Sequence, residues 1–256
     1  MSKATRKLRK TRQNGKASHD HNVVHPAAFE DHGPGWHPLE DEINGRRDQK
    51  YVKNIKPRSE GQATLMQAIK EHSLTLAVGP AGTGKTYLAI ASAVEALEAG
   101  TIERIILSRP AMEAGESIGF LPGDLEEKMA PYLRPLFDCL GDRLGGKKVR
   151  QFIEDGTIEI APIGFMRGRT LNNSFVVIDE AQNCTYAQLK MILSRLGWHS
   201  TMVITGDPAQ SDLLEGISGL REIADKLETL DNIAVIRLCG DDIVRHPLVA
   251  KMLGVL

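Results

Sequence analysis

The chain is 256 residues long, enough for one substantial α/β domain and an extension. Its formal net charge of −1 excludes a strong global attraction to nucleic acid, so any such surface has to be a local patch. There is no apolar run of membrane-spanning length, and the three cysteines lack Cys-x-x-Cys spacing, which predicts a cytoplasmic protein with free thiols and no membrane partner.

Residues 1–50 are expected to form a flexible basic extension. Every charged residue from Lys3 to Lys16 is basic, and polar sequence with several histidines and prolines follows. Such a segment is either a solubilising tail or an arm that touches phosphates without sequence preference, and both interpretations stay open. The histidines from His19 to His37 have no cysteine among them and no helical pair with an acidic partner. An incidental cluster is therefore favoured over a metal site.

The globular domain is expected over residues 51–256, and it begins with an amphipathic helix at Ala63–His72. Gln62 stands just before this helix and upstream of the first strand. Its amide can donate and accept hydrogen bonds at once, which suits the N6/N7 edge of adenine. An ordinary residue at a helix start is an equal alternative. No Asn-Lys-x-Asp segment supports guanine.

The strongest motif lies between a predicted buried strand, Leu74–Val78, and a predicted helix, Tyr87–Leu97. The residues between them match G-x-x-x-x-G-K-[ST], the loop that wraps the phosphates of a nucleotide. Lys85 is expected to reach the β- and γ-phosphates, and the Thr86 hydroxyl to bind Mg²⁺. The residues predicted to bind the nucleotide here are Gly79, Pro80, Ala81, Gly82, Thr83, Gly84, Lys85 and Thr86. The chain therefore binds a nucleoside triphosphate.

A second strand is expected at Arg104–Ser108, and Arg109 follows it at the edge where open α/β sheets place their ligands. Two helices, at 124–140 and 147–154, and a strand at 158–161 come next. Arg167 and Arg169 then lie in a glycine-containing loop. They are either solvated cations or contacts to phosphates of nucleic acid or of a neighbouring subunit's nucleotide. Arg109 is a third candidate for such contacts.

Phe175–Ile178 is an apolar run that ends in two adjacent carboxylates. Strands buried on both faces of a parallel sheet have this composition. Asp179 is expected to hold the Mg²⁺ shell, and Glu180 to act as the general base that polarises the attacking water. A helix at 185–196 is predicted to follow.

The last third of the chain adds a strand at 201–205, a helix at 217–230, a strand at 233–238 and a short helix that starts at Arg245. Thr205 and Gln210 are expected near the γ-phosphate or the attacking water, with a plain Gly-Asp-Pro turn as the alternative. Arg245 is either a surface residue or an arginine finger, which where it exists raises turnover by about 10³–10⁵.

In this order the motifs resemble motifs I, II and III of superfamily 1 helicases, and more closely the PhoH-like ATPase family. The likeness covers about Lys53 to Leu256. The segments that carry it are Ser108–Ala111, Glu113–Glu116, Gly119–Gly123, Tyr132–Leu136, Met166–Thr170, Ile178–Asn183 and Arg245–Leu248.

This resemblance implies one RecA-like P-loop NTPase domain, with a mostly parallel sheet flanked by helices, that hydrolyses ATP with Mg²⁺. It also implies a homo-oligomeric ring, a hexamer, that associates with RNA or another single-stranded nucleic acid. Gln62 would read adenine, and Arg245 would act on a neighbour's γ-phosphate. Superfamily 1 helicases place ATP between two RecA-like domains, whereas this length holds one. A second subunit is therefore expected to complete the site.

Three classes of function remain open. The chain is a ring ATPase acting on nucleic acid as a helicase or translocase, a ring ATPase that remodels a protein or supports a nuclease, or a small-molecule kinase. The Asp179–Glu180 pair argues against the kinase, because a base aimed at water favours hydrolysis. The motifs favour the first class, against the near-neutral charge and the lack of a recognisable nucleic-acid-binding module.

Overall fold

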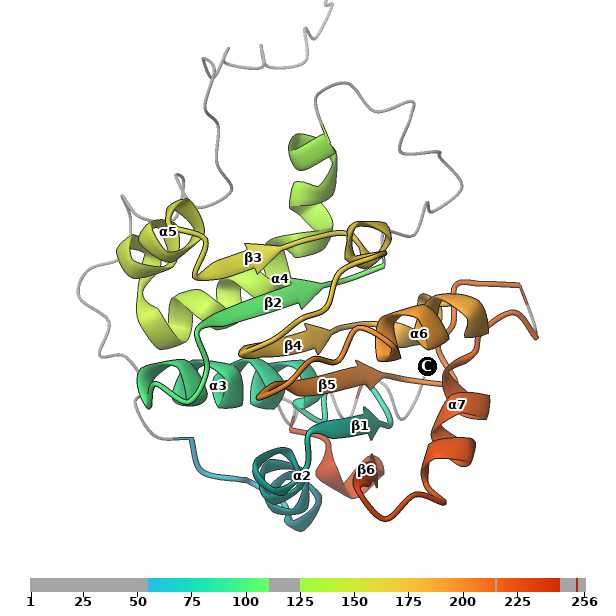
Figure 1. The fold of residues 1–256 in the computed structure, drawn as a ribbon. Coiled ribbons are helices and arrows are strands. Elements are labelled where there is room, and N and C mark those ends of the chain that lie inside the picture. The colour runs from blue at the N-terminus through green and yellow to red at the C-terminus, as the bar shows by residue number, and fades with distance from the viewer. Residues whose placement is uncertain (1–54, 111–124, 215, 245–251, 253–256) are drawn as a thin grey trace, which may run out of the picture. The chain divides into compact units, whose positions relative to one another are not determined.

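The fold is built on a six-stranded parallel sheet in the order β3-β2-β4-β5-β1-β6 (Figure 1). It is seen in a computed structural model that describes residues 55–110, 125–214, 216–244 and 252, with the backbone alone for 125–132. The strands are β1 Leu74–Val78, β2 Arg104–Ser108, β3 Ile158–Ile160, β4 Ser174–Ile178, β5 Thr201–Gly206 and β6 Ile233–Arg237. Because all their pairings are parallel, the carboxyl ends of these strands meet at one edge of the sheet.

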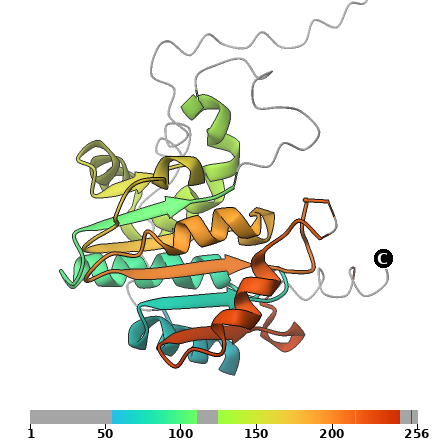
Figure 2. The same cartoon turned by 45° about the vertical axis from the view of Figure 1, so that its right-hand side comes forward.

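Helices cover both faces of this sheet (Figures 1 and 2). One face carries α2 Glu60–Glu71, α3 Lys85–Glu98, α4 Leu125–Leu144 and α5 Gly146–Glu154. The other carries α6 Tyr186–Leu193 and α7 Leu220–Leu227, with the short 3₁₀ turns η2 Ile163–Met166 and η3 Ala181–Asn183. A third turn, η4 Gly240–Asp242, follows β6.

The side chains along each strand alternate between the two faces of the sheet, and this alternation explains why two cores form. Phe175 and Val177 of β4 pack among the first group of helices, whereas Val176 and Ile178 pack on the opposite side with α6 and α7. Side chains of successive strand residues point to opposite faces, so a strand covered on both sides has to be apolar throughout. All five residues of β1 and of β4 are buried, as the apolar runs predict.

The predicted α/β class and the parallel sheet flanked by helices are confirmed. The expected N-terminal extension, the segment 111–124 and Arg245 with its helix lie outside the described residues. Among the described helices, none is long and apolar enough to cross a membrane.

Two helices on the second face are shorter than predicted. The helix expected at 217–230 begins at Leu220, because Gly219 packs against the backbone of Tyr186, where an added Cβ would lie 2.3 Å from the Tyr186 Cα. Ile217 and Leu230, the predicted ends of this helix, are exposed. The helix expected to reach residue 196 ends at Leu193.

Candidate active site

The loop Gly79–Thr86, here called the phosphate-binding loop, joins β1 to α3 and borders a cavity of about 300 Å³. Gly79, Gly82 and Gly84 have φ angles of 147°, 85° and 84°, which side chains with a Cβ rarely adopt. At Gly79 an added Cβ would also lie 2.4 Å from the Leu238 carbonyl oxygen. Gly84 precedes α3 without a side-chain cap, so the first N–H groups of that helix face the loop, as an anion site requires.

Lys85 is buried within this loop, and its ammonium is held by the loop's own carbonyls. Nζ donates to the carbonyl oxygens of Gly79 and Pro80 at 2.6 and 2.7 Å. Burial lowers the pKa of Lys85, and the carboxylates of Asp207, Glu180 and Asp179 oppose that shift. Phosphate oxygens are stronger acceptors for an ammonium than neutral carbonyls are. The loop therefore holds the Lys85 ammonium at the place where an incoming phosphate would replace these carbonyls as its hydrogen-bond acceptor.

Asp179, at the end of β4, accepts hydrogen bonds from two threonine hydroxyls. Thr86 Oγ1 donates to Asp179 Oδ1 at 2.6 Å, and Thr205 Oγ1 donates to the same oxygen at 2.7 Å. Thr205 is fully buried because β5 lies between β1 and β4. Its hydroxyl thus contacts Asp179 from the buried side, which is the position called behind Asp179 below.

The donor set at this point fits Mg²⁺. A threonine hydroxyl and one carboxylate are the few protein ligands that Mg²⁺ takes when it binds together with nucleotide phosphates. The residues that the structure describes contain no group of three or more His, Cys, Asp or Glu side chains that could hold a metal without such help. Thr86 and Asp179 are therefore suited to an ion that arrives with a nucleotide.

Glu180 stands in the left-handed region, with φ 53° and ψ 41°. For a residue with a Cβ this backbone conformation costs about 1–2 kcal/mol, and such costs cluster at functional sites. One carboxylate oxygen accepts a hydrogen bond from Gln182 Nε2, and Gln182 Oε1 accepts one from the Asp207 N–H at 3.0 Å. The backbone turn and Gln182 together fix the Glu180 carboxylate at the cavity wall.

Arg109 follows β2 and also lines the cavity. Its guanidinium nitrogens lie 3.5 Å from Asp179 Oδ2 and 3.4 Å from Glu180 Oε1. The sequence groups Arg109 with Arg167 and Arg169 as candidates for nucleic acid or an interface. In the structure it lies with the two carboxylates, while the other two arginines follow η2.

Gln62 is buried against the phosphate-binding loop. Its Nε2 donates to the Thr83 carbonyl at 3.0 Å, and its Oε1 accepts from the Arg58 N–H at 2.9 Å. An amide has a second hydrogen and a second lone pair, so these contacts leave one donor and one acceptor position. The reading of adenine by Gln62 stays a prediction.

Several residues that line the cavity have no motif in the sequence to mark them. Gln210 is expected there, whereas its neighbour Asp207 is predicted only as part of a turn. Asp207 directly follows the buried strand β5, just as Asp179 directly follows β4. This shared position after a strand is the sequence feature that could have predicted Asp207 in the site. Tyr87, from α3, and Cys139, from α4, complete the wall. Burial, ahead of the Asp179 charge, raises the pKa of Cys139 to about 12, so this thiol stays neutral.

The C-terminal segment returns to the loop just before Arg245. The Val244 N–H donates to the Gly82 carbonyl at 2.9 Å. Arg245 itself lies outside the described residues, so its role as a finger stays a prediction.

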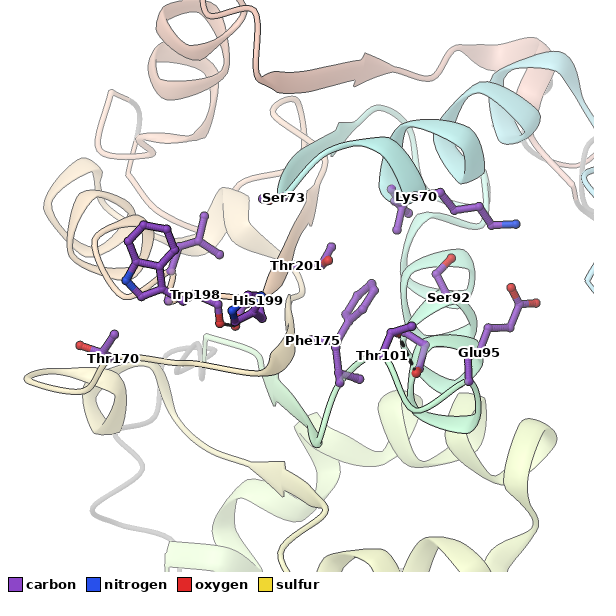
Figure 3. A pocket seen from close by; sticks show the side chains of 17 residues that line it. Lys70, Ser73, Ser92, Glu95, Thr101, Thr170, Phe175, Trp198, His199 and Thr201 are labelled. Carbon is purple, nitrogen blue, oxygen red and sulfur yellow. Dashed lines mark hydrogen bonds between the residues drawn. The ribbon is translucent and has the colours of Figure 1, made fainter.

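A larger cavity, of about 1120 Å³, lies at the opposite edge of the sheet, where the strands begin. Figure 3 shows Phe175 in its middle, Trp198 and Thr170 at one end and Glu95 at the other. Open parallel sheets bind their ligands at the carboxyl ends of the strands. The smaller cavity at the phosphate-binding loop is therefore the candidate active site.

The sequence model of the PhoH-like protein family matches residues 54–256. A PhoH-like protein of Bacillus subtilis is 54% identical over 202 residues, which cover 78% of this chain and 63% of that protein. Protein PhoH of Escherichia coli K12 is 42% identical over 214 residues, which cover 82% of this chain and 60% of that protein. The chain thus spans about three fifths of the length of these relatives. Among solved structures, the large terminase of a thermophilic bacteriophage aligns with a TM-score of 0.48 and 12% identity, over 77% of this chain and 50% of that one.

Proposed function

This chain belongs to the PhoH-like protein family, and we propose that it is a Mg²⁺-dependent ATP hydrolase whose turnover is coupled to RNA or another single-stranded nucleic acid. One observation carries the proposal. Lys85 and Thr86 follow β1, Asp179 and Glu180 follow β4, and the fold brings all four to a single cavity. A cation, a hydroxyl, a metal-binding carboxylate and a second carboxylate together are what hydrolysis of a triphosphate needs.

The phosphate-binding loop would hold the triphosphate through its N–H groups and through Lys85, which exchanges the Gly79 and Pro80 carbonyls for phosphate oxygens. Mg²⁺ held by Thr86 and Asp179 would neutralise charge on the β- and γ-phosphates.

Glu180 is proposed as the general base. Its carboxylate would accept a proton from the attacking water while the water oxygen bonds to the γ-phosphorus and the bond to the β-γ bridging oxygen breaks. ADP and inorganic phosphate are then the products. Gln182 would keep the base in place, and Gln210, which also lines the cavity, would orient the water. Arg109 would have to release Glu180 for this role.

We also propose a ring-shaped homo-oligomer, a hexamer, in the cytoplasm. The support is membership of the PhoH-like family, since the resemblance implies a ring in which an arginine acts on a neighbour's nucleotide. Arg245 from one subunit would then reach the γ-phosphate bound by its neighbour.

The test is the steady-state rate of ATP hydrolysis by the purified chain, with and without single-stranded RNA and DNA, over a salt titration. We expect stimulation that fades as salt rises, because phosphate contacts weaken through counterion release. Lys85→Ala should abolish hydrolysis, and near-normal turnover of that variant would refute the site. Hydrolysis that neither polymer changes at low salt would instead indicate an ATPase that remodels a protein or supports a nuclease.

A further inference from the structure

The turn η2 presents an aromatic side chain to solvent. Ile163 and Met166 are buried in the core beside α6, and between them Phe165 is 60% exposed. Backbone hydrogen bonds from Phe165 N–H to the Pro162 carbonyl and from Arg167 N–H to the Gly164 carbonyl close the turn. Two buried anchors and a closed backbone hold the phenyl ring outward. Its exposure is thus built into the turn.

Two arginines lie on or against the loop that follows this ring. Arg167 is exposed, and Arg195, beyond α6, donates from Nη1 to the Arg169 carbonyl at 3.1 Å, which brings it to the same loop. Within the described part of the chain neither of these arginines forms an ion pair. Arg195 uses three of its five N–H groups on Met191, Ser194 and Arg169, so two remain for a ligand.

Arg169 is different, because a carboxylate neutralises it. Its guanidinium pairs with Glu159 of β3 through two hydrogen bonds, one of them 2.7 Å long. This pairing raises the pKa of Arg169 and lowers that of Glu159. The positive charges that remain for a ligand are therefore those of Arg167 and Arg195. Arg169 holds the loop against β3.

The turn lies beyond the tip of β3, at the edge of the sheet that also carries the active site (Figure 1). Ala161 N–H donates to the Leu107 carbonyl at 3.0 Å, so the start of the turn is tied to β2 two residues before Arg109. Arg109 in turn contacts Glu180. A ligand on the turn is thus connected, through the end of β2, to the proposed base.

We infer that Phe165, Arg167 and Arg195, here called the η2 surface, bind single-stranded nucleic acid, with a base stacked on Phe165 and phosphates on the two guanidiniums. An exposed aromatic ring beside unpaired cations is the combination that binds unpaired strands without sequence preference. A duplex hides its base faces, so it offers the phenyl ring nothing to stack on. The inference rests on the proposed function and names the residues that would contact its polymer.

The test is binding of fluorescein-labelled oligouridine and oligothymidine to the full chain, measured by anisotropy at several salt concentrations without ATP. Stacking is worth about 1–3 kcal/mol per base, so Phe165→Ala should weaken binding by roughly 5- to 150-fold, with the salt dependence unchanged. Phe165→Trp should restore it. Arg167→Ala should weaken binding and reduce the slope of log K against log salt by about 0.7.

Leu230→Ala is the control, because Leu230 is a 51% exposed apolar residue that precedes β6, at the far end of the strand order from β3. It should bind as the wild type does, and Phe165→Ala should keep the ATPase rate seen without polymer. Unchanged binding by Phe165→Ala, or duplex bound as tightly as single strands, would overturn the η2 surface while leaving hydrolysis intact. A wild-type chain that binds these strands but does not hydrolyse ATP would refute the proposed ATPase alone.

Discussion

The hydroxyls of Thr86 and Thr205 both donate a hydrogen bond to Asp179 Oδ1. This arrangement indicates a specific role for Thr205. The sequence predicts that Thr205 contacts the γ-phosphate or the attacking water. Its buried position behind Asp179 suggests that it instead orients the carboxylate that would bind Mg²⁺. The two roles have different kinetic consequences, so they can be separated.

Thr205→Val keeps the shape of the side chain and removes the hydrogen bond to Asp179. A hydrogen bond to a charged group contributes about 1.5–3 kcal/mol, so we expect the Mg²⁺ concentration for half-maximal ATPase to rise about tenfold or more. The rate at saturating Mg²⁺ should recover. Thr75→Val is the control, because the Thr75 hydroxyl is equally buried but donates to a backbone carbonyl of α2. A lower rate at saturating Mg²⁺ with unchanged half-saturation would favour the contact with phosphate or water.

At the scale of elements, Asp242 of η4 joins the C-terminal segment to the start of α2. Its carboxylate accepts from Ser59 Oγ at 2.6 Å and from the Cys239 N–H at 2.9 Å. Gly61 lies so close that an added Cβ would be 2.4 Å from Asp242 Oδ1. Through this junction η4 is fixed beside both Gln62 and the chain that leads to Arg245.

The pH dependence of stability should report this junction. The hydrogen bond from Ser59, followed by that from Cys239, lowers the pKa of Asp242 in the folded chain. A lowered pKa means that the carboxylate stabilises the fold above about pH 4, its ordinary pKa, and that this stabilisation is lost as the pH falls through the lower folded value. Asp242→Asn should therefore cost about 1–3 kcal/mol near pH 7 and much less near pH 3.

Urea unfolding of both proteins from pH 7 to pH 3 measures this difference. Asp241→Asn is the control, since it removes the same charge from the exposed neighbouring residue. It should change stability little at any pH. If the cost of Asp242→Asn is the same at both ends of the range, the ionised carboxylate does not stabilise the junction.

At the scale of the whole molecule, the proposed ring would bring Arg245 of one subunit to the nucleotide bound by its neighbour. Arg245→Ala should lower ATP turnover by about 10³–10⁵ if this residue is an arginine finger. Mixing it with Lys85→Ala should restore part of the activity, because some interfaces would pair an intact loop with an intact finger. Native mass spectrometry would show whether the two variants share oligomers, and mixed oligomers without any recovered activity would exclude action across the interface.

The sequence was most informative where function depends on neighbours in the chain. The phosphate-binding loop and the pair Asp179–Glu180 each follow an apolar strand, so a local pattern was enough to place them. Tyr87 and Cys139 reach the cavity through the packing of α3 against α4, which no local pattern encodes. The pairing of Arg169 with Glu159 likewise depends on how the loop folds back on β3, so the three arginines looked alike before the structure separated them.

The strand order has a consequence for how this chain is made. β1 carries the phosphate-binding loop, yet its two neighbours are β5 and β6, the last strands of the sheet. On the ribosome, β1 emerges early and has no partner on either side until most of the domain has been synthesised. Contacts between segments so far apart in sequence form slowly, because a long stretch of chain has to close first. We therefore expect the edges of β1 to stay unpaired until β5 has been synthesised, and this delay is a point at which a chaperone would act.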